Sequence, residues 1–286
     1  MLFERGNPNH TEKQDAMNRK RERTLVIDSA QWAGTRPYQN DVMYIGRKPK
    51  SNMTLLALAD GLGTDAEAGK AATAVIDEIR SVFEQTTANK ELHQIALGLL
   101  GQANRHVYHM NQSQLANGAA TIGATAACVL LQSGRFSIAS VGNVRVFLVR
   151  SGAVLQLNRD HLKSLEAEEE DILSGDEPDV TPAMAMMVTS YLGMEDMKKI
   201  DYIRTPIRMV SGDYVVLMSS GLYGVFPDPE LVALLYGGPP QDAAKRVIER
   251  LQYLQPESQS NASLIVLSME DNSSGRQMTY NTYYTY

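Results

Sequence analysis

The strongest hydrophobic pattern in the chain is the run at residues 55–59, which ends in Asp60, Gly61, Leu62 and Gly63. An unbroken apolar run predicts a strand that is buried on both faces, and the glycines predict a turn directly after it. From Ala66 the apolar residues are spaced by three and four, which predicts an amphipathic helix. A buried strand therefore delivers the Asp60 carboxylate to a loop that opens a helix.

The run at residues 212–222 repeats this design, because an apolar strand again ends in small polar residues and a glycine. Apolar runs predict further strands near the start of the ordered chain and at its end. Apolar residues at helical spacing predict two further helices. The predicted strands are 24–28, 42–45 and 263–269, and the predicted helices are about 89–112 and 241–254.

Four β-rich runs follow Gly123-Ala124-Thr125, at 126–131, 136–141, 144–149 and 154–157. Their separators are Ser133-Gly134, Gly142-Asn143 and Ser151-Gly152, pairs that are typical of two-residue hairpin turns. We therefore predict an antiparallel meander of about four strands. Strands, paired helices, a meander and a final strand, helix and strand predict an α+β fold.

Three segments lack this periodicity. Residues 1–23 are polar and basic and predict a disordered arm, and 271–286 form a tyrosine-rich tail. Residues 163–188 are acidic and then rich in methionine, which predicts a functional flap. We expect a single domain at 24–270 with this flap and both tails.

Composition excludes several classes of function. The net charge of −6 argues against a nucleic-acid binder, and there is no apolar stretch of about 18 residues that would span a membrane. The N-terminal residues lack a signal-peptide pattern, so a cytoplasmic location is expected. The lone Cys128 lies in an apolar run and is interpreted as a core thiol. His106 and His109 have a metal-binding spacing, but no third ligand is near in sequence, which favours a solvated helix face.

Two further residues offer site chemistry. Arg36 follows a glycine turn at Gly34, and Asp41 comes five residues later, at the start of an apolar run. The guanidinium group of arginine is a rigid fork of donors suited to phosphate. Asp60 and the Gly61 carbonyl are oxygen ligands suited to a hard cation. Taken alone, however, Arg36 is an ordinary exposed arginine, and Asp60-Gly61 is an ordinary turn.

The order of these pieces over residues 24–269 resembles the PPM family of metal-dependent protein phosphatases, the type 2C serine/threonine phosphatases. The matching residues are Arg36 with Asp41, Asp60-Gly61, Gly123-Ala124-Thr125, Val141-Gly142-Asn143-Val144-Arg145, Asp160-His161, Leu192-Gly193, Gly212-Asp213, Ser219-Ser220-Gly221-Leu222 and Ser260-Asn261-Ala262-Ser263. The resemblance implies a four-layer α-β-β-α sandwich of two antiparallel sheets flanked by helix pairs. It also implies a metal cleft at one end, where Arg36 contacts phosphate and Asp41 lies behind the metal ligands.

The departures from the family pattern fall on the metal ligands. Ser220 and Ser260 stand where the family has aspartates, Asn143 stands at a third-metal aspartate, and Asn40 replaces a glutamate behind the ligands. Because neutral oxygens are weak ligands for divalent ions, Asp60 and Gly61 are expected to hold at most one weak Mg²⁺ or Mn²⁺. Rescue by acids that are near in sequence stays open, and the candidates are Asp65, Glu67 and Glu257.

The resulting prediction is a PPM-fold protein with an impaired metal centre. It is expected to be a pseudophosphatase that acts by binding or regulating phosphoprotein signalling, and not a competent enzyme. Its expected partner is a protein, either a phosphoprotein or a kinase, with no nucleic acid or membrane. The alternative is an active, divergent Mn²⁺- or Mg²⁺-dependent serine/threonine phosphatase. A third hypothesis is a subunit whose flap and tails join a larger assembly.

Overall fold

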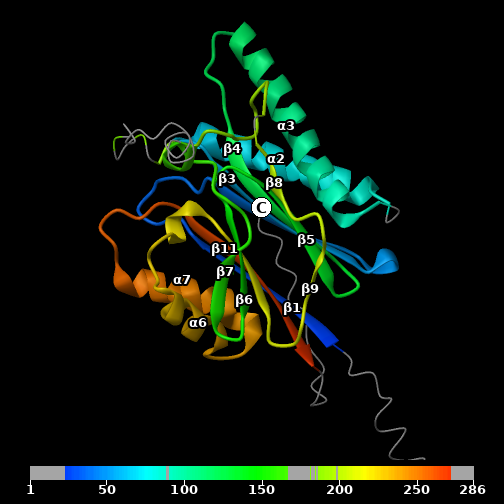
Figure 1. Cartoon of the computed structure of the whole chain (residues 1–286). Helices are drawn as coiled ribbons and strands as arrows, with labels where there is room; N and C mark the ends of the chain where they lie inside the picture. The colour runs from blue at the N-terminus through cyan, green and yellow to red at the C-terminus, as the bar shows by residue number, and fades with distance from the viewer. Residues whose placement is uncertain are drawn as a thin grey trace, which may run out of the picture.

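The computed structural model describes residues 23–87, 90–166, 181, 184, 186–197 and 199–271. Two antiparallel sheets stack face to face, and helices cover both outer sides (Figure 1). The five-stranded sheet has the order β1 (Arg23–Trp32), β11 (Ala262–Asp271), β10 (Tyr214–Met218), β6 (Arg145–Arg150) and β7 (Ala153–Gln156). The six-stranded sheet has the order β2 (Asp41–Lys48), β3 (Met53–Gly61), β4 (Ala124–Gln132), β5 (Arg135–Val141) and β8 (Asp201–Tyr202), with β9 (Ile207–Arg208) also paired to β5.

Two helix pairs complete the layers. Helices α2 (Ala66–Gln85) and α3 (Leu92–Ala116) pack on the six-stranded sheet, and α6 (Asp228–Tyr236) and α7 (Ala243–Leu254) pack on the five-stranded sheet. Short 3-10 turns lie at Pro49–Ser51, Ser220–Leu222 and Pro240–Asp242. Three buried apolar layers result, one between the sheets and one beneath each helix pair. The α+β fold with two antiparallel sheets and flanking helices is confirmed.

Strand β3 lies near the middle of its sheet, and its side chains are buried from Met53 to Ala59. The β3 side chains alternate between the inter-sheet core and the core beneath α2 and α3. This explains why the run is apolar at every position: both faces of the strand are covered. The prediction of a doubly buried strand that ends in Asp60 is confirmed.

The predicted four-strand meander is wrong. Strands β4 and β5 pair in the six-stranded sheet, whereas β6 and β7 pair in the five-stranded sheet. Gly142-Asn143 therefore joins the two sheets instead of closing a hairpin. The Asn158 side chain holds this crossing, because it donates to Ser140 Oγ on β5 at 3.0 Å and accepts from the β6 amide of Val146 at 2.7 Å.

Some element boundaries also differ from prediction. The helix predicted at 89–112 begins at Leu92 and ends at Ala116. The helix predicted from residue 241 is preceded by a 3-10 turn, so α7 begins at Ala243. Helix α6 was not predicted, because its nine residues between Pro227 and Gly237 include a short apolar run without a clear period.

Several predictions lie outside the described residues, namely the arm before Arg23, the tail after Asp271 and most of the 163–188 flap.

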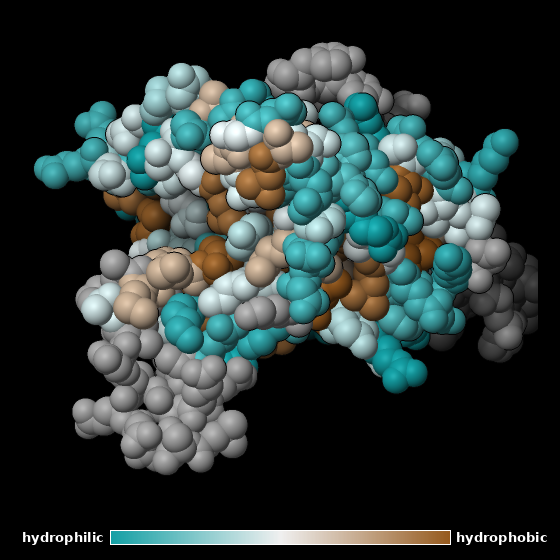
Figure 2. Space-filling view, turned by 90° about the horizontal axis from the view of Figure 1, so that it is seen from above, coloured by the Kyte–Doolittle hydropathy of each residue, from teal (hydrophilic) through white to brown (hydrophobic). Residues whose placement is uncertain are grey.

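Over the described ranges, none of the helices combines the length and apolarity that a membrane span requires. Seen from above, hydrophobic residues form separate patches enclosed by hydrophilic ones (Figure 2).

Candidate active site

Two carboxylates lie side by side at one end of the six-stranded sheet. Asp41 begins β2, and its Cα partner across the β2–β3 pair is Asp60. Each carboxylate accepts a hydrogen bond from a serine that follows β10: Ser219 Oγ donates to Asp41 Oδ2 at 2.7 Å, and Ser220 Oγ donates to Asp60 Oδ2 at 2.8 Å. The ends of the two sheets are therefore joined through two serine–aspartate hydrogen bonds.

Burial sets the charge of this pair. Asp41 is 3% exposed, and burial, with the neighbouring charge of Asp60, raises the pKa of Asp41 to about 8. Burial also raises the pKa of Asp60, although the hydrogen bonds from Ser220 partly oppose the shift. Without a cation, the buried pair therefore holds a proton more readily than two separate exposed carboxylates would.

Both turns beside the pair require glycine. A Cβ on Gly61 would lie 2.0 Å from the Ala68 carbonyl oxygen, and one on Gly221 would lie 2.1 Å from the Asn261 carbonyl oxygen. Real Cβ atoms do not approach backbone that closely, so each glycine allows a neighbouring segment to close on the site. At Gly61 that segment is the first turn of α2, and at Gly221 it is the loop that precedes β11.

Two asparagines hold the surrounding loops. Asn261 Oδ1 accepts from the Asn40 backbone amide at 2.8 Å, and Asn261 Nδ2 donates to the carbonyls of Ala33 and Tyr38, both at 2.9 Å. Asn40 Nδ2 donates in turn to the Asp65 carbonyl at 3.0 Å. The loop that carries Arg36 is thus fixed at both of its ends, while Arg36 itself is exposed.

Ser260 lies beside the same loop. The amide of Thr35 donates to the Gln259 carbonyl at 3.0 Å, and Gln259 Nε2 donates to the carbonyls of Gly221 and Ser260 at 2.7 and 2.9 Å. These contacts bring the segments of Ser260 and Ser220 together, although the residues are far apart in the sequence. Gly34 has φ +68° and no room for a Cβ against the Gln259 carbonyl, which explains the glycine in this turn.

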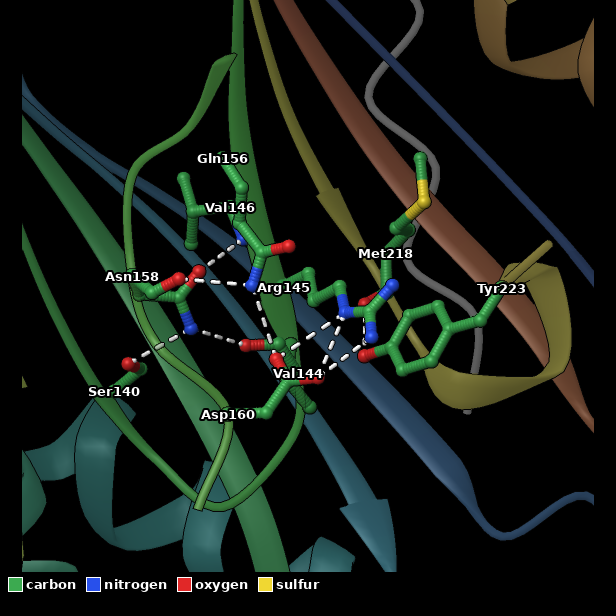
Figure 3. Close-up of polar contacts among 9 residues, drawn as sticks. All are labelled: Ser140, Val144, Arg145, Val146, Gln156, Asn158, Asp160, Met218 and Tyr223. Carbon is green, nitrogen blue, oxygen red and sulfur yellow. Dashed lines mark hydrogen bonds and ion pairs between the residues drawn. The ribbon is translucent and has the colours of Figure 1, made fainter. Parts of the chain in front are cut away.

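Asn143 follows Gly142 at the crossing between the sheets and is 8% exposed. Behind it, Arg145 forms a bidentate ion pair with Asp160, with the shortest distance 2.6 Å, and stacks over the Tyr223 ring at 3.9 Å (Figure 3). Tyr223 follows the turn that contains Ser220. This network therefore joins the Asn143 crossing to the Ser220 turn.

Two of the three candidate rescue acids, Asp65 and Glu67, make other contacts. Asp65 caps α2, because its carboxylate accepts from the amides of Glu67 and Ala68 at 3.1 and 3.3 Å. Glu67 pairs with Lys70 on the same helix at 2.5 Å. Glu257 is exposed in the loop before Ser260. Within the described ranges, no three side chains among histidine, cysteine, aspartate and glutamate gather as a metal-binding group.

The other candidate residues do not reach the site. His106 and His109 are exposed on α3, and His106 lies 3.8 Å from Glu78 across to α2. Cys128 is buried in β4, and burial raises the pKa of its thiol to about 12, as a core thiol requires. The core interpretation of Cys128 is confirmed.

Comparison with known proteins shows which proteins this chain resembles. The profile of the family described as "Protein phosphatase 2C" matches residues 35–173, which include Arg36, both aspartates and Asn143. Residues 35–173 are therefore similar to the protein phosphatase 2C, or PPM, family. The Ser220 and Ser260 turns lie outside the matched range, so their positions come from the structure alone.

Curated relatives resemble part of the chain, and solved structures share its fold. A serine/threonine phosphatase stp from Listeria monocytogenes is 24% identical over 196 residues, which cover 65% of this chain and 73% of that protein. A serine/threonine phosphatase from S. agalactiae has TM-score 0.72 at 21% identity, covering 86% of this chain and 99% of that one. The catalytic domain of the phosphatase PstP, in complex with two manganese ions, has TM-score 0.66 at 22% identity, covering 87% and 100%.

Sequence reasoning predicted the scaffold and the acidic residues of the site more completely than the contacts between them. The family resemblance places Asp41, Asp60 and Ser220 at one site, but neither the role of Ser219 as the donor to Asp41 nor the hydrogen bond from Ser220 to Asp60 was predicted. Ser220 is separated from Asp60 by 160 residues, so no local pattern could reveal their contact. The roles of Arg36, Asp41, Asp60 and Gly61 in catalysis stay predictions.

Proposed function

We propose that this chain acts on proteins phosphorylated on serine or threonine, as a PPM-family serine/threonine phosphatase with weak affinity for its metal. The relatives are named serine/threonine phosphatases, and they favour hydrolysis over the pseudophosphatase prediction. The observation that carries the proposal is the Asp41–Asp60 pair, held at the end of β3 beside the loop of Arg36.

The residues present fit one divalent ion better than two. The Asp60 carboxylate and the Gly61 carbonyl would hold Mg²⁺ or Mn²⁺, with the Ser220 hydroxyl beside them. Such an ion supplies a water of lowered pKa and neutralises charge on the phosphoryl group. Two ions carry four positive charges, and the two carboxylates of Asp41 and Asp60 balance them poorly.

The residues of the chain itself prepare the rest of the reaction. Arg36 is exposed at the rim and would grip the phosphate oxygens through its guanidinium fork. Asn261 and Asn40 fix the backbone on either side of that loop, so the arginine is presented from a held segment. Asp41 is fully buried behind Asp60, and it would keep the Asp60 carboxylate oriented and compensate its charge.

A second candidate function is phosphoprotein binding without hydrolysis. Ser220 and Ser260 supply neutral oxygens where the PPM resemblance implies carboxylates, and Ser220 Oγ already donates to Asp60. A hydroxyl that donates to the ligand stabilises the carboxylate without a metal, so it competes with ion binding. This observation favours a protein that binds phosphorylated partners, a phosphoprotein or a phosphorylated kinase, and releases them unchanged.

Turnover and binding assays separate the two candidates. We expect hydrolysis of a phosphothreonine peptide to require millimolar Mn²⁺ and to be lost in Asp60→Asn, whereas Glu84→Gln at the far end of α2 should behave as wild type. Binding of the peptide that depends on Arg36, without turnover at any Mn²⁺ concentration, would support the second candidate. If the protein shows no turnover and no binding that depends on Arg36, both candidate functions are wrong.

A further inference from the structure

A cavity of about 350 Å³ lies between the C-terminal half of α3 and the segment at residues 191–196. Its walls combine aromatic and apolar side chains with two carboxylates, and none of its lining residues is basic. The lining residues are Tyr108, Asn111, Gln112, Leu115, Thr121, Tyr191, Gly193, Met194, Glu195 and Asp196. Leu115 is 54% exposed, so the cavity opens to solvent beside an apolar side chain.

Buried amides of α3 hold one wall of this cavity in place. Asn111 Nδ2 donates to the Gly193 carbonyl at 3.0 Å, and Asn104 Oδ1 accepts from the Gly193 amide at 2.8 Å. Asn104 Nδ2 also donates to the Met194 carbonyl at 3.1 Å. Tyr191 packs against Gly123, where a Cβ would lie 2.6 Å from its ring. The wall formed by Tyr191, Gly193 and Met194 is therefore held in place by the fold.

The cavity adjoins the candidate active site. Leu192 and Ala124 exchange backbone hydrogen bonds of 2.8 and 3.2 Å, and Ala124 is the Cα partner of Gly61 across β3 and β4. Two strand spacings therefore separate Leu192 from Gly61, which is about 10 Å. An extended peptide advances about 3.3 Å per residue, so this distance corresponds to about three residues.

The chemistry of the walls selects a cation. Glu195 and Asp196 are exposed, and in the part of the chain that the structure describes neither forms an ion pair. Burial and the neighbouring charge of Glu195 both raise the pKa of the Tyr108 hydroxyl. Aromatic faces and carboxylates around one space attract a guanidinium or ammonium group through cation–π and ionic contacts.

We propose that this cavity binds an arginine or lysine side chain of the phosphorylated protein, about three residues from the phosphorylated serine or threonine. The inference rests on the proposed action on phosphoproteins and adds a sequence preference to it. It assigns Tyr108, Tyr191, Glu195 and Asp196 to recognition of the residue beside the phosphate. None of these residues has a part in the metal or phosphate site described above.

The test compares peptides that differ only in charge. Phosphothreonine peptides carry arginine three positions away, on the N-terminal side in one and the C-terminal side in the other, and matched peptides carry citrulline, a neutral isostere. Dissociation constants are measured by fluorescence anisotropy, with unphosphorylated forms of all four peptides alongside. We expect one arginine peptide to bind wild type about tenfold more tightly than its citrulline match, the size of a desolvated cation–π contact with ionic support.

Variants locate the effect. The preference should fall to twofold or less in the double variant Glu195→Gln with Asp196→Asn. It should be retained in Asp77→Asn with Glu84→Gln, which removes two carboxylate charges from the exposed face of α2. Equal binding of arginine and citrulline peptides to wild type would overturn the cavity assignment. A preference that survives the double variant would overturn it as well.

The two proposals fail in different ways. If phosphorylation adds nothing to affinity but arginine still adds tenfold through Glu195 and Asp196, the cavity assignment stands and the proposed function is wrong. If phosphorylation increases affinity through Arg36 while arginine adds nothing, the proposed function stands and the cavity assignment is wrong.

Discussion

The two strand ends that face each other in the candidate active site have the same construction but different charge. Strand β3 ends in Asp60-Gly61, and Ser220-Gly221 lies in the turn after β10. At each glycine a backbone carbonyl oxygen lies so close that an added Cβ would clash with it, at 2.0 Å for Gly61 and 2.1 Å for Gly221. One turn presents a carboxylate and the other a hydroxyl, and they are joined by a hydrogen bond of 2.8 Å. The two turns thus share one backbone construction, while only one of them carries a negatively charged side chain.

This difference separates scaffold from ligand chemistry. Close backbone contacts at Gly61 and Gly221 do not depend on a metal, whereas divalent ion affinity depends on the number of carboxylates. The comparison therefore predicts that the fold is sensitive to the glycines and that metal binding is limited by the serines. The first three tests below probe the scaffold, and the last probes the charge.

The largest expected effect is on the glycine at the serine side. Gly221→Ala should lower the free energy of unfolding by about 3 kcal/mol, because its Cβ would meet the Asn261 carbonyl oxygen and force backbone movement. Urea denaturation measures the change. In the matched control Gly98→Ala on α3, nothing lies within 4 Å of the new Cβ, and stability should rise by about 0.5–1 kcal/mol. A Gly221→Ala protein as stable as wild type would contradict the close contact.

The next effect concerns pH at the crossing behind Asn143. Burial lowers the pKa of His161, and its Nδ1 accepts from the Gly142 amide at 3.0 Å, so the folded protein holds this imidazole neutral. The unfolded chain protonates it below about pH 6.5, so its contribution to stability is present above that pH and is lost as the pH falls. One such group changes the free energy of unfolding by at most about 1.4 kcal/mol per pH unit.

Denaturation of wild type and His161→Gln between pH 5 and 7 checks this sign. Wild type should lose more stability than His161→Gln as the pH falls, since glutamine stays neutral and keeps an acceptor near Gly142. Parallel pH profiles for the two proteins would show that His161 does not titrate with unfolding.

A smaller effect is expected at the start of α2, beside the aspartate side of the comparison. Asp65→Ala should cost about 1 kcal/mol, because it removes the carboxylate that caps the amides of Glu67 and Ala68. Lys70→Ala, which breaks the exposed pair with Glu67, should cost less than about 0.5 kcal/mol. Both variants should bind Mn²⁺ as wild type does, and a lost affinity in Asp65→Ala would mean that Asp65 is a ligand.

Much of the fold could be predicted because its signals are local. The doubly buried β3 shows as an unbroken apolar run, and α2 and α7 show as apolar positions three and four apart. The crossing at Gly142-Asn143 could not be separated from a hairpin, because the same two residue types serve both. What decides it is Asn158, 14 residues beyond Val144, whose side-chain amide donates to the Val144 carbonyl at the crossing.

The site was only partly readable for the same reason. Asp60 and Gly61 are marked by the strand that precedes them, and Arg36 by a glycine turn. The hydrogen bonds that define the site join Ser219 to Asp41 across 178 residues and Asn40 to Asn261 across 221 residues. Neither pair has a sequence signature, so the coupling of the two carboxylates to the serines emerges only from the packed sheets.

Titration calorimetry with Mn²⁺ tests the central claim that charge, and not the scaffold, limits metal binding. Wild type should bind at most one ion weakly, and Asp60→Asn should abolish that binding. Ser220→Asp with Ser260→Asp should bind Mn²⁺ at least tenfold more tightly, and it should be less stable than wild type without metal because like charges then face Asp60. Two tight Mn²⁺ sites in wild type, or a double variant with no gain in affinity, would contradict the claim.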